Sequence, residues 1–263
     1  MSMLFQVDMN VLKQLLSLKF TNIRKVLFDK FINYYIWASC TMFVSGYLMQ
    51  SFGLSEKFGV FQFAGIIASG AIFEIYGTAA KMVADFEHDQ IIAYYLTLPT
   101  HTATVLCSNV LYNTIVGSVM AIFLLPLAKL ILWSQLNFFA IAWTKFLFLL
   151  VLVNLVCSTA SLLVAALIPS MDKFEMLWVR IIFPLWFLGG FQFSWDSVHA
   201  VAPKVSYFML LNPIFYMTEG MRAVMLGQNG SINFWVCSLV LLITLIIMSI
   251  WSFKMLKKRL DFV

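Results

Sequence analysis

Long apolar segments alternate with short polar ones along most of this chain. Six segments hold about twenty or more mostly apolar residues each, the length that a helix needs to cross the hydrocarbon core of a bilayer. They predict six transmembrane helices: Phe31–Ser51, Gly59–Ala84, Thr104–Trp133, Phe138–Ile168, Phe174–Phe193 and Ile232–Phe253. Only the polar turn 134–137 separates the third segment from the fourth, so these two should form a hairpin. We therefore expect an all-α integral membrane protein with one transmembrane domain over residues 1–263.

The composition leads to the same class of protein. The chain has 263 residues, of which 62% are hydrophobic and 11% charged, and its mean hydropathy is +0.91. Soluble domains are about 45–50% apolar and about 25% charged. A water-soluble fold of this size could not bury so much apolar surface. The composition thus excludes a cytosolic enzyme, a secreted disulfide scaffold and a disordered protein.

The basic residues indicate the orientation in the membrane. Of the 17 lysines and arginines, twelve fall on the side of the two termini and five on the opposite side. Cytoplasmic loops carry the excess of lysine and arginine in membrane proteins. Both termini are therefore predicted to be cytoplasmic.

Residues 1–30 are predicted to form an amphipathic helix rather than a cleavable signal. Their charges recur at helical spacing, with apolar residues such as Leu12 and Leu15 on one side and basic residues such as Lys13 on the other. Lys19 and Leu18 break this pattern. A basic amphipathic helix lies flat in the cytoplasmic interface. The alternative is a solvated basic tail.

The cytoplasmic loop Asp85–Thr102 begins with polar residues and continues with apolar ones. Asp89 is expected to cap a short helix that stops before Pro99, because the residue before a proline avoids the helical region. A short helix with exposed apolar residues is suited to docking into a groove of a soluble partner. The alternative is a loop that packs on the membrane surface.

The outward segment Phe191–Ser231 contains a second short helix. Asn212 and Pro213 are typical of an N-cap followed by proline at the first helical position, and Gly227 is typical of a helix end. The helix between them, Ile214–Leu226, is too short to cross the membrane. Since irregular backbone inside a membrane must be shielded by protein or line a wet cavity, we expect this helix to dip into the outer leaflet. It places Glu219 and Arg222 three residues apart on one face.

Two further features concern a transport path. Glu74 is the carboxylate predicted to lie deepest in the membrane. In one interpretation it faces a partner or a water-filled path. In the other, the second span unwinds early and Glu74 lies in the interface. The aromatic residues Phe183, Phe187 and Phe191 recur at helical spacing. They either line a route for sugars or lipid chains or serve packing.

The sequence lacks the residues that several kinds of catalytic or binding site require. No Gly-Lys dipeptide occurs, so the phosphate-binding loop of nucleotide hydrolases is missing, and no protease or hydrolase motif is found. The four cysteines and three histidines are dispersed, which gives no support for a metal site. We expect no catalytic residues, no metal and no cofactor on this chain, so energy for any transport must come from elsewhere.

The order of these elements resembles the permease subunit of an ABC exporter of the type-2 class. The segment Leu211–Gly227 is similar to the Asn-Pro … Tyr … Glu-x-x-Arg … Gly segment that precedes the last span in that family. Leu96–Thr100, read Leu-Thr-Leu-Pro-Thr, resembles the end of its coupling-helix region. The resemblance divides the chain into a connecting helix (1–30), spans one to five (31–189), a re-entrant outer segment (190–231) and the last span with a basic tail (232–263).

The resemblance also implies partners. Two copies of this chain would pair with two separate ABC ATP-binding subunits, which bind ATP and magnesium, and the chain would contact membrane lipids but no nucleic acid. Val7–Phe28 would be the connecting helix that braces a coupling helix. The residues implied at the ATPase contact are Asp89, Gln90, Ile91, Tyr95, Leu96, Leu98 and Pro99. Those implied at an outer gate are Asn212, Pro213, Tyr216, Glu219, Arg222 and Gly227.

One departure from the family pattern concerns the approach to the coupling helix. Basic residues are common there in the family, whereas this chain has Asp85, Glu87 and Asp89 with only Lys81 nearby. A cognate ATPase should therefore offer basic residues to this segment.

The function expected from this resemblance is ATP-driven export from the cytoplasm or inner leaflet, in a plasma membrane and specifically a bacterial inner membrane. The cargo would be a polysaccharide, a glycolipid, a lipid or an amphiphilic drug. The alternative is an ion-coupled transporter or channel that acts without an ATPase, with Glu74 as its best support. A membrane-embedded enzyme would need a cluster of polar residues that this sequence does not offer.

Overall fold

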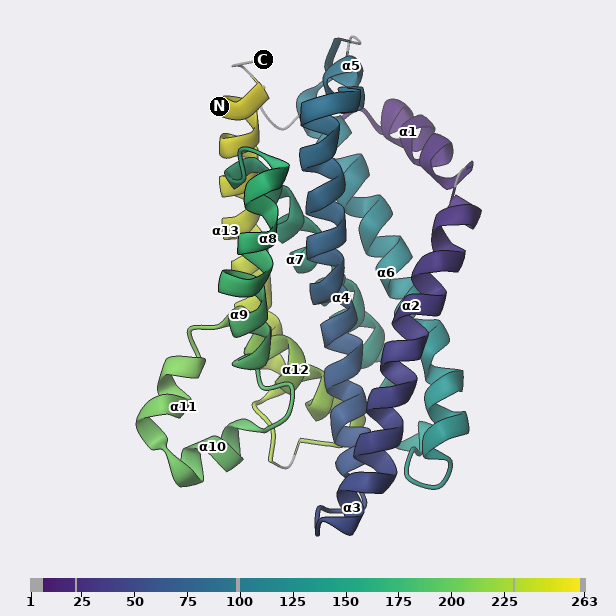
Figure 1. Ribbon diagram of the computed structural model, residues 1–263, viewed down its shortest axis with the longest axis vertical. Coiled ribbons are helices and arrows are strands. Elements are labelled where there is room, and N and C mark those ends of the chain that lie inside the picture. The colour runs from purple at the N-terminus through teal and green to yellow at the C-terminus, as the bar shows by residue number, and fades with distance from the viewer. Residues whose placement is uncertain (1–6, 22, 98–99, 229, 261–263) are drawn as a thin grey trace.

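The computed structural model describes residues 7–21, 23–97, 100–228 and 230–260. Within these ranges the chain consists of helices joined by turns, without a strand, which confirms the all-α prediction. The long helices run side by side along the longest axis of the molecule (Figure 1). Helices α1 (Met9–Thr21) and α5 (Ile91–Thr97) lie at one end, which we call the terminal end because the first and the last described residues also lie there. Helix α3 (Met49–Ser51) lies at the opposite, far end.

Four helices are long and apolar enough to cross a membrane. They match the second, third, fourth and sixth predicted spans, and they identify the chain as a multi-pass membrane protein. Even the shortest of them, with 25 residues, extends about 37 Å at 1.5 Å per residue, more than the roughly 30 Å of the hydrocarbon core. They are α4 (Phe58–Ala84), α6 (Thr102–Leu132), α7 (Trp143–Leu167) and α13 (Phe234–Leu260).

The first predicted span is helical but less apolar. Helix α2 (Ile23–Phe43) continues through a π-helical turn, η2 (Val44–Leu48), directly into α3. The charged residues Asp29 and Lys30 lie in the first half of α2 and lower its hydropathy. Helix α2 nevertheless runs beside α4 and α6 along the bundle (Figure 1).

The fifth predicted span is shorter than expected. Helix α8 (Phe174–Leu177), the π turn η6 (Trp178–Ile182) and α9 (Phe183–Phe187) together reach only Phe187, not Phe193. The chain turns at this point because Gly189 and Gly190 follow, and Gly190 adopts a left-handed φ of +75°. These 14 helical residues span about 21 Å. The count of six spans therefore stays a prediction.

The amphipathic helix is also shorter than predicted. Helix α1 ends at Thr21, and α2 already begins at Ile23, so the separate helix does not extend to Phe28. The side chain of Asp8 caps α1 by accepting hydrogen bonds from the first backbone N–H groups of the helix. Helix α1 packs against α6, and it buries Leu12 and Leu15 as the pattern predicts.

The two residues that break the amphipathic pattern have different environments. Leu18 is exposed. Lys19 points toward α6, where its ammonium group donates hydrogen bonds to Ser108 Oγ, at 2.9 Å, and to Asn109 Oδ1. Burial lowers the pKa of Lys19 from 10.5 to about 8. Lys19 is thus a docking contact between α1 and α6 rather than a solvated charge.

The remaining boundaries differ by a few residues. Helix α7 begins at Trp143 rather than Phe138, because Asn137 caps a separate 3₁₀ turn, η4 (Phe138–Ala140), in the hairpin. Helix α13 runs on past Phe253 to Leu260. The other short helices are η3 (Asp85–Asp89), η5 (Met171–Lys173), α10 (Trp195–Val201), α11 (Pro203–Met209) and α12 (Pro213–Met225).

The core of the bundle forms around α4 and α7, which pack against each other and against α6, α12 and α13. Helix α2 packs closely against α4 at the position of Gly70. A Cβ atom at Gly70 would lie 2.2 Å from the Tyr34 hydroxyl oxygen, so only glycine permits this approach. The Tyr34 hydroxyl donates a hydrogen bond to the carbonyl oxygen of Ile66, which fixes the crossing of the two helices.

Candidate functional site

Helix α12 has the boundaries that the sequence predicts to within one residue. The side chain of Asn212 caps it by accepting a hydrogen bond from the backbone N–H of Ile214 at 3.1 Å, and Pro213 is its first residue. The helix ends before Gly227, which adopts a φ of +98°. Helix α12 packs against α4, α7 and α13 inside the bundle, toward its far end (Figure 1). Protein therefore shields this helix, which is one of the two environments expected for it, and its position in the outer leaflet stays a prediction.

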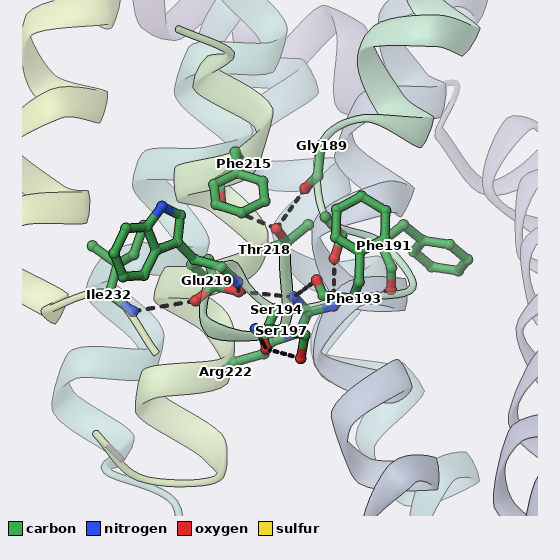
Figure 2. Close-up of polar contacts among 12 residues, drawn as sticks. Gly189, Phe191, Phe193, Ser194, Ser197, Phe215, Thr218, Glu219, Arg222 and Ile232 are labelled. Carbon is green, nitrogen blue, oxygen red and sulfur yellow. Dashed lines mark hydrogen bonds and ion pairs between the residues drawn. The ribbon is translucent and has the colours of Figure 1, made fainter. Parts of the chain in front are cut away.

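A fully buried ion pair lies on the inner face of α12. Nη1 of Arg222 is 3.0 Å from Oε1 of Glu219, and neither side chain is exposed. The guanidinium of Arg222 also stacks on the ring of Phe61 from α4, 3.7 Å from its centroid. Its nitrogens donate to the backbone carbonyls of Gly190, Phe191 and Phe193 at 2.5, 3.0 and 2.8 Å (Figure 2). Arg222 therefore holds the turn that follows α9.

The carboxylate of Glu219 holds two other chain segments. It accepts hydrogen bonds from the backbone N–H of Trp195, at 3.4 Å, and of Ile232, at 3.1 Å. Trp195 is the first residue of α10, and Ile232, which Figure 2 shows beside Glu219, precedes α13. A buried charge is tolerated only when it is paired and hydrogen-bonded, and these contacts satisfy that requirement for Glu219.

Two neutral side chains complete the arrangement. Thr218 donates to the carbonyl of Gly189 at 2.7 Å, and Asn212 donates through Nδ2 to the carbonyl of Leu185 at 2.6 Å. We call Asn212, Thr218, Glu219 and Arg222 the α12 clasp. Through it α12 binds the end of α9, the start of α10 and the start of α13 to one another.

The clasp includes residues that sequence reasoning missed. Asn212, Glu219 and Arg222 were predicted together, whereas Thr218 and the aromatic partner Phe61 were not. No local pattern links Phe61 to Arg222, because the two lie far apart in the sequence. Among the other predicted gate residues, Pro213 and Gly227 define the ends of α12, and Tyr216 is half-buried beside α13, where it lines an apolar cavity.

At the terminal end, α4 continues into the π turn η3 and then into α5 (Figure 1). The cap of α5 is Asp85, not Asp89 as predicted. The two oxygens of Asp85 accept hydrogen bonds from the backbone N–H groups of Ile91 and Ile92 at 3.0 and 2.9 Å. The reason is that Gln90 adopts a left-handed φ of +51°, which reverses the chain and brings the start of α5 back to Asp85.

The π turn is fastened to two other parts of the bundle. Glu87 accepts a hydrogen bond from the backbone N–H of Met171, in the turn after α7, at 3.2 Å. Arg259 of α13 lies over the ring of Phe86, 4.6 Å from its centroid, and donates to the carbonyls of Ala165 and Ile168. Helices α4, α7 and α13 therefore meet at the base of α5.

These contacts change the expectation for the acidic approach to α5. The Asp85 carboxylate serves the cap with both oxygens, and Glu87 uses one oxygen for Met171. Within the described part of the chain, Asp89 is the member of the three whose side chain makes no hydrogen bond or ion pair, and it is exposed. The predicted complementarity to a basic ATPase surface therefore centres on Asp89.

Helix α5 presents two apolar side chains to the outside. Ile91 is 49% exposed and Tyr94 is 62% exposed, whereas Ile92 is buried. Tyr95, one of the predicted contact residues, is half-buried. Tyr94 was not predicted, because the pattern alone does not tell which side of so short a helix faces the bundle.

The other predicted coupling residues are placed as follows. Asp89 ends the π turn, and Gln90 forms the reversal before α5. Leu96 belongs to α5. Leu98 and Pro99 lie outside the described residues.

Glu74 lies inside α4, which stays helical to Ala84. The alternative in which the inner end of this span unwinds earlier is therefore wrong. The Glu74 carboxylate forms an ion pair with the ammonium group of Lys30 from α2. Sequence reasoning missed this partner because it grouped Lys30 with the basic residues that precede the first span.

The three predicted aromatic residues do not form one face. Phe183 and Phe187 stack on each other on the exposed side of α9, with ring centroids 6.1 Å apart. Phe191 lies beyond the end of α9, because that helix stops at Phe187, and it is buried between Trp37 and Trp186. Phe191 therefore serves packing.

Residues 9–226, which run from α1 to the end of α12, match the family described as ABC-2 type transporter. The chain belongs to the ABC-2 type transporter family. It is an ABC transporter permease subunit, and the family implies partnership with an ABC ATP-binding subunit. A search among curated proteins finds no match to this chain.

The region of this ABC-2 permease that matches the family contains both candidate elements described above. The cap and the exposed residues of α5 and all four residues of the α12 clasp fall within residues 9–226. Helix α13 lies outside the match, but it packs along α7 and α12 and contacts the base of α5 through Arg259.

Proposed function

We propose that this permease subunit forms the membrane half of an ATP-driven exporter. Two copies of the chain combine with two ATP-binding subunits, which hold ATP and magnesium, while this chain binds no cofactor or metal itself. The chain crosses a bacterial inner membrane six times, with α2 and the α8–α9 segment counted as spans. Both termini lie on the cytoplasmic side. The exported cargo is a polysaccharide, a glycolipid, a lipid or an amphiphilic drug.

The observation that supports this proposal is the rigid attachment of α5 to the bundle. Asp85 caps α5, Glu87 ties its approach to the turn after α7, and Arg259 packs on Phe86 from α13. A short helix fixed at three points transmits a displacement to the long helices instead of absorbing it. Its exposed residues Ile91 and Tyr94 offer the apolar anchors that a groove on an ATPase would receive.

Transport then follows from differential binding. ATP favours the closed arrangement of the two ATP-binding subunits, and α5 follows their movement because it is docked to them. The movement passes through the base of α5 to α4, α7 and α13. At the far end the α12 clasp acts as the outer gate, since a shift of α12 relative to α9 or α13 must move the segments that Arg222 and Glu219 hold.

The transport path is proposed to pass a cavity that Glu74 lines and the exposed aromatic pair Phe183 and Phe187. An ion-coupled transporter or channel without an ATPase is the less favoured function. Its best support was Glu74 as an isolated carboxylate, and Glu74 is paired with Lys30. Membership of an ABC-2 family also favours an ATP-driven partner.

Purification from native membranes tests the proposal. The chain should be isolated in mild detergent and its companions identified and quantified by mass spectrometry. We expect a soluble subunit with a phosphate-binding loop in a 1:1 ratio, and its loss from the double variant Ile91→Asp, Tyr94→Ala. Phe139→Ala is the matched control, because Phe139 is fully exposed in the hairpin between α6 and α7. Recovery of the intact chain without any ATPase in several detergents would contradict the proposal.

A further inference from the structure

A cavity of about 350 Å³ opens between α2, α4, α6 and α7. Both members of the Lys30–Glu74 ion pair line it, together with Lys81 of α4 and Asn154 of α7. Two aromatic side chains, Trp37 and Phe73, form part of the same wall, with ring centroids 5.0 Å apart. The cavity is distinct from the α12 clasp and from the docking face of α5.

The charged groups of this cavity sum to one positive charge. Lys30 and Lys81 are cationic, and Glu74 compensates Lys30 through the ion pair. Within the described residues, Lys81 makes no hydrogen bond and no ion pair. Lys81 is exposed to solvent and also lines the cavity. An unpaired cation beside a largely apolar space attracts an anionic group.

The polar and apolar parts of the cavity are arranged along the bundle. Lys81 lies seven residues, or about two helical turns, closer to the terminal end of α4 than Glu74 does. On α2, Trp37 lies about two turns deeper than Lys30. The positive charge is therefore near the terminal end, while the aromatic rings lie toward the middle of the bundle.

The geometry points to a binding site for an amphiphile with an anionic head group, a phosphate or a carboxylate. The head group contacts Lys81 and Lys30 near the terminal end, and the first part of the hydrocarbon chain packs against Trp37 and Phe73. This inference deepens the proposed export function, on which it rests, by naming an anionic amphiphile as the class of cargo. In this site Glu74 lowers the affinity for the anionic head group, because its ion pair with Lys30 neutralises the charge of that lysine.

The test uses the full chain in dodecyl maltoside and dodecyl phosphate as the probe. Binding is measured as the dependence of the thermal unfolding midpoint on the fraction of dodecyl phosphate in the micelle. We expect a saturable rise for the wild type, and about tenfold weaker binding for Lys81→Gln, since one charge-assisted contact is lost. Glu74→Gln should bind the probe more tightly, because Lys30 becomes available. The control Lys57→Gln removes an exposed lysine at the far end and should bind as the wild type does.

Two further probes distinguish binding of an anionic amphiphile from non-specific binding of a hydrocarbon chain and from binding of free phosphate. Dodecyltrimethylammonium carries the same chain with a cationic head and should give no saturable rise, whereas inorganic phosphate should compete only at much higher concentration than dodecyl phosphate. Equal effects of the anionic and cationic amphiphiles, or equal weakening by Lys57→Gln and Lys81→Gln, would overturn the site. Saturation by inorganic phosphate at the same concentration as dodecyl phosphate would also overturn it as an amphiphile site.

Failure of this inference is distinguishable from failure of the proposed function. If dodecyl phosphate shows no charge-dependent binding while an ATP-binding subunit copurifies, the export function stands and this site is wrong. If the binding pattern holds but no ATPase copurifies, the site stands and the ATP-driven function is wrong.

Discussion

Arg222 and Glu219 form an ion pair 3.0 Å long in which neither side chain reaches solvent. The pair does more than satisfy its own charges, because each partner also binds backbone groups of distant segments. The clasp thus explains why a short amphipathic helix with a charge pair can lie inside an apolar bundle. The cost of burying these charges is offset only while both partners and their backbone contacts are present.

Loss of the Arg222 guanidinium should therefore be severe. Arg222→Gln leaves Glu219 buried without its cation and frees three carbonyls, so we expect destabilisation of about 3–5 kcal/mol, as for other broken buried pairs. Arg222→Lys keeps the charge but not the forked donor geometry, and it should fall between the wild type and Arg222→Gln. The measurement is thermal or denaturant unfolding of the purified chain in detergent.

Arg180→Gln is the control for this series. Arg180 is exposed on the π turn between α8 and α9, so its removal should change stability little. Equal stability of Arg222→Gln and Arg180→Gln would show that the clasp does not hold the outer segment together.

The cap of α5 gives a second prediction. Asp85→Ala removes the acceptor of the Ile91 and Ile92 amides and should destabilise α5 by about 1–2 kcal/mol, the usual cost of a lost N-cap. Hydrogen exchange of the amides of residues 91 and 92 should accelerate accordingly. Asp89→Ala, four residues away, should leave these amides protected. If Asp89→Ala accelerates exchange as much as Asp85→Ala does, the assignment of the cap is wrong.

Two glycines of α4 provide a matched pair for the contact between α2 and α4. A Cβ at Gly70 would lie 2.2 Å from the Tyr34 hydroxyl, whereas a Cβ at Gly77 would meet no heavy atom within 4 Å. Gly70→Ala should destabilise the chain by about 1–3 kcal/mol through overpacking. Gly77→Ala should be neutral or stabilising by up to about 1 kcal/mol, because alanine favours the helix. Unfolding midpoints in the opposite order would contradict the tight crossing of α2 and α4.

The docking of α1 on α6 should depend on pH through Lys19. The pKa of Lys19 is about 8 when α1 is docked and 10.5 when it is not, so the docked state binds fewer protons between these two values. Stability therefore rises as the pH increases from about 8 toward 10.5. The unfolding midpoint of the wild type should therefore rise relative to that of Lys19→Met as the pH increases from 7 to 9.5.

Lys13→Met is the control for this comparison, because it removes an exposed lysine from the same helix. A constant difference between the wild type and Lys19→Met over the same pH range would show that Lys19 is not buried against α6.

Local signals in the sequence predicted the elements that depend on local chemistry. Asn212, Pro213 and Gly227 fixed α12 to within one residue, because a cap, a proline and a left-handed glycine act on their immediate neighbours. The apolar lengths of α4, α6, α7 and α13 likewise follow from the thickness of a bilayer. The helical spacing placed Glu219 and Arg222 on one face of this helix, and the structure brings them into contact.

Contacts between segments far apart in the sequence could not be predicted from local signals. The partner of Glu74 is Lys30 on another helix, and the ring beneath Arg222 is Phe61, far away in the sequence. The cap of α5 was assigned to Asp89, because a sequence pattern does not reveal the left-handed turn at Gln90 that selects Asp85. The signal that could have revealed Lys30 was its position directly before Phe31, the first residue of the predicted first span.

Site-specific photo-crosslinking tests the central claim, that α5 docks on an ATP-binding subunit, most directly. A photoreactive phenylalanine analogue would replace Ile91 on α5, and in a separate variant it would replace Phe139 in the hairpin between α6 and α7. Irradiation of native membranes should capture a subunit with a phosphate-binding loop from position 91 and not from position 139. Capture of that subunit from position 139, or from neither position while the chain is intact, would contradict the account.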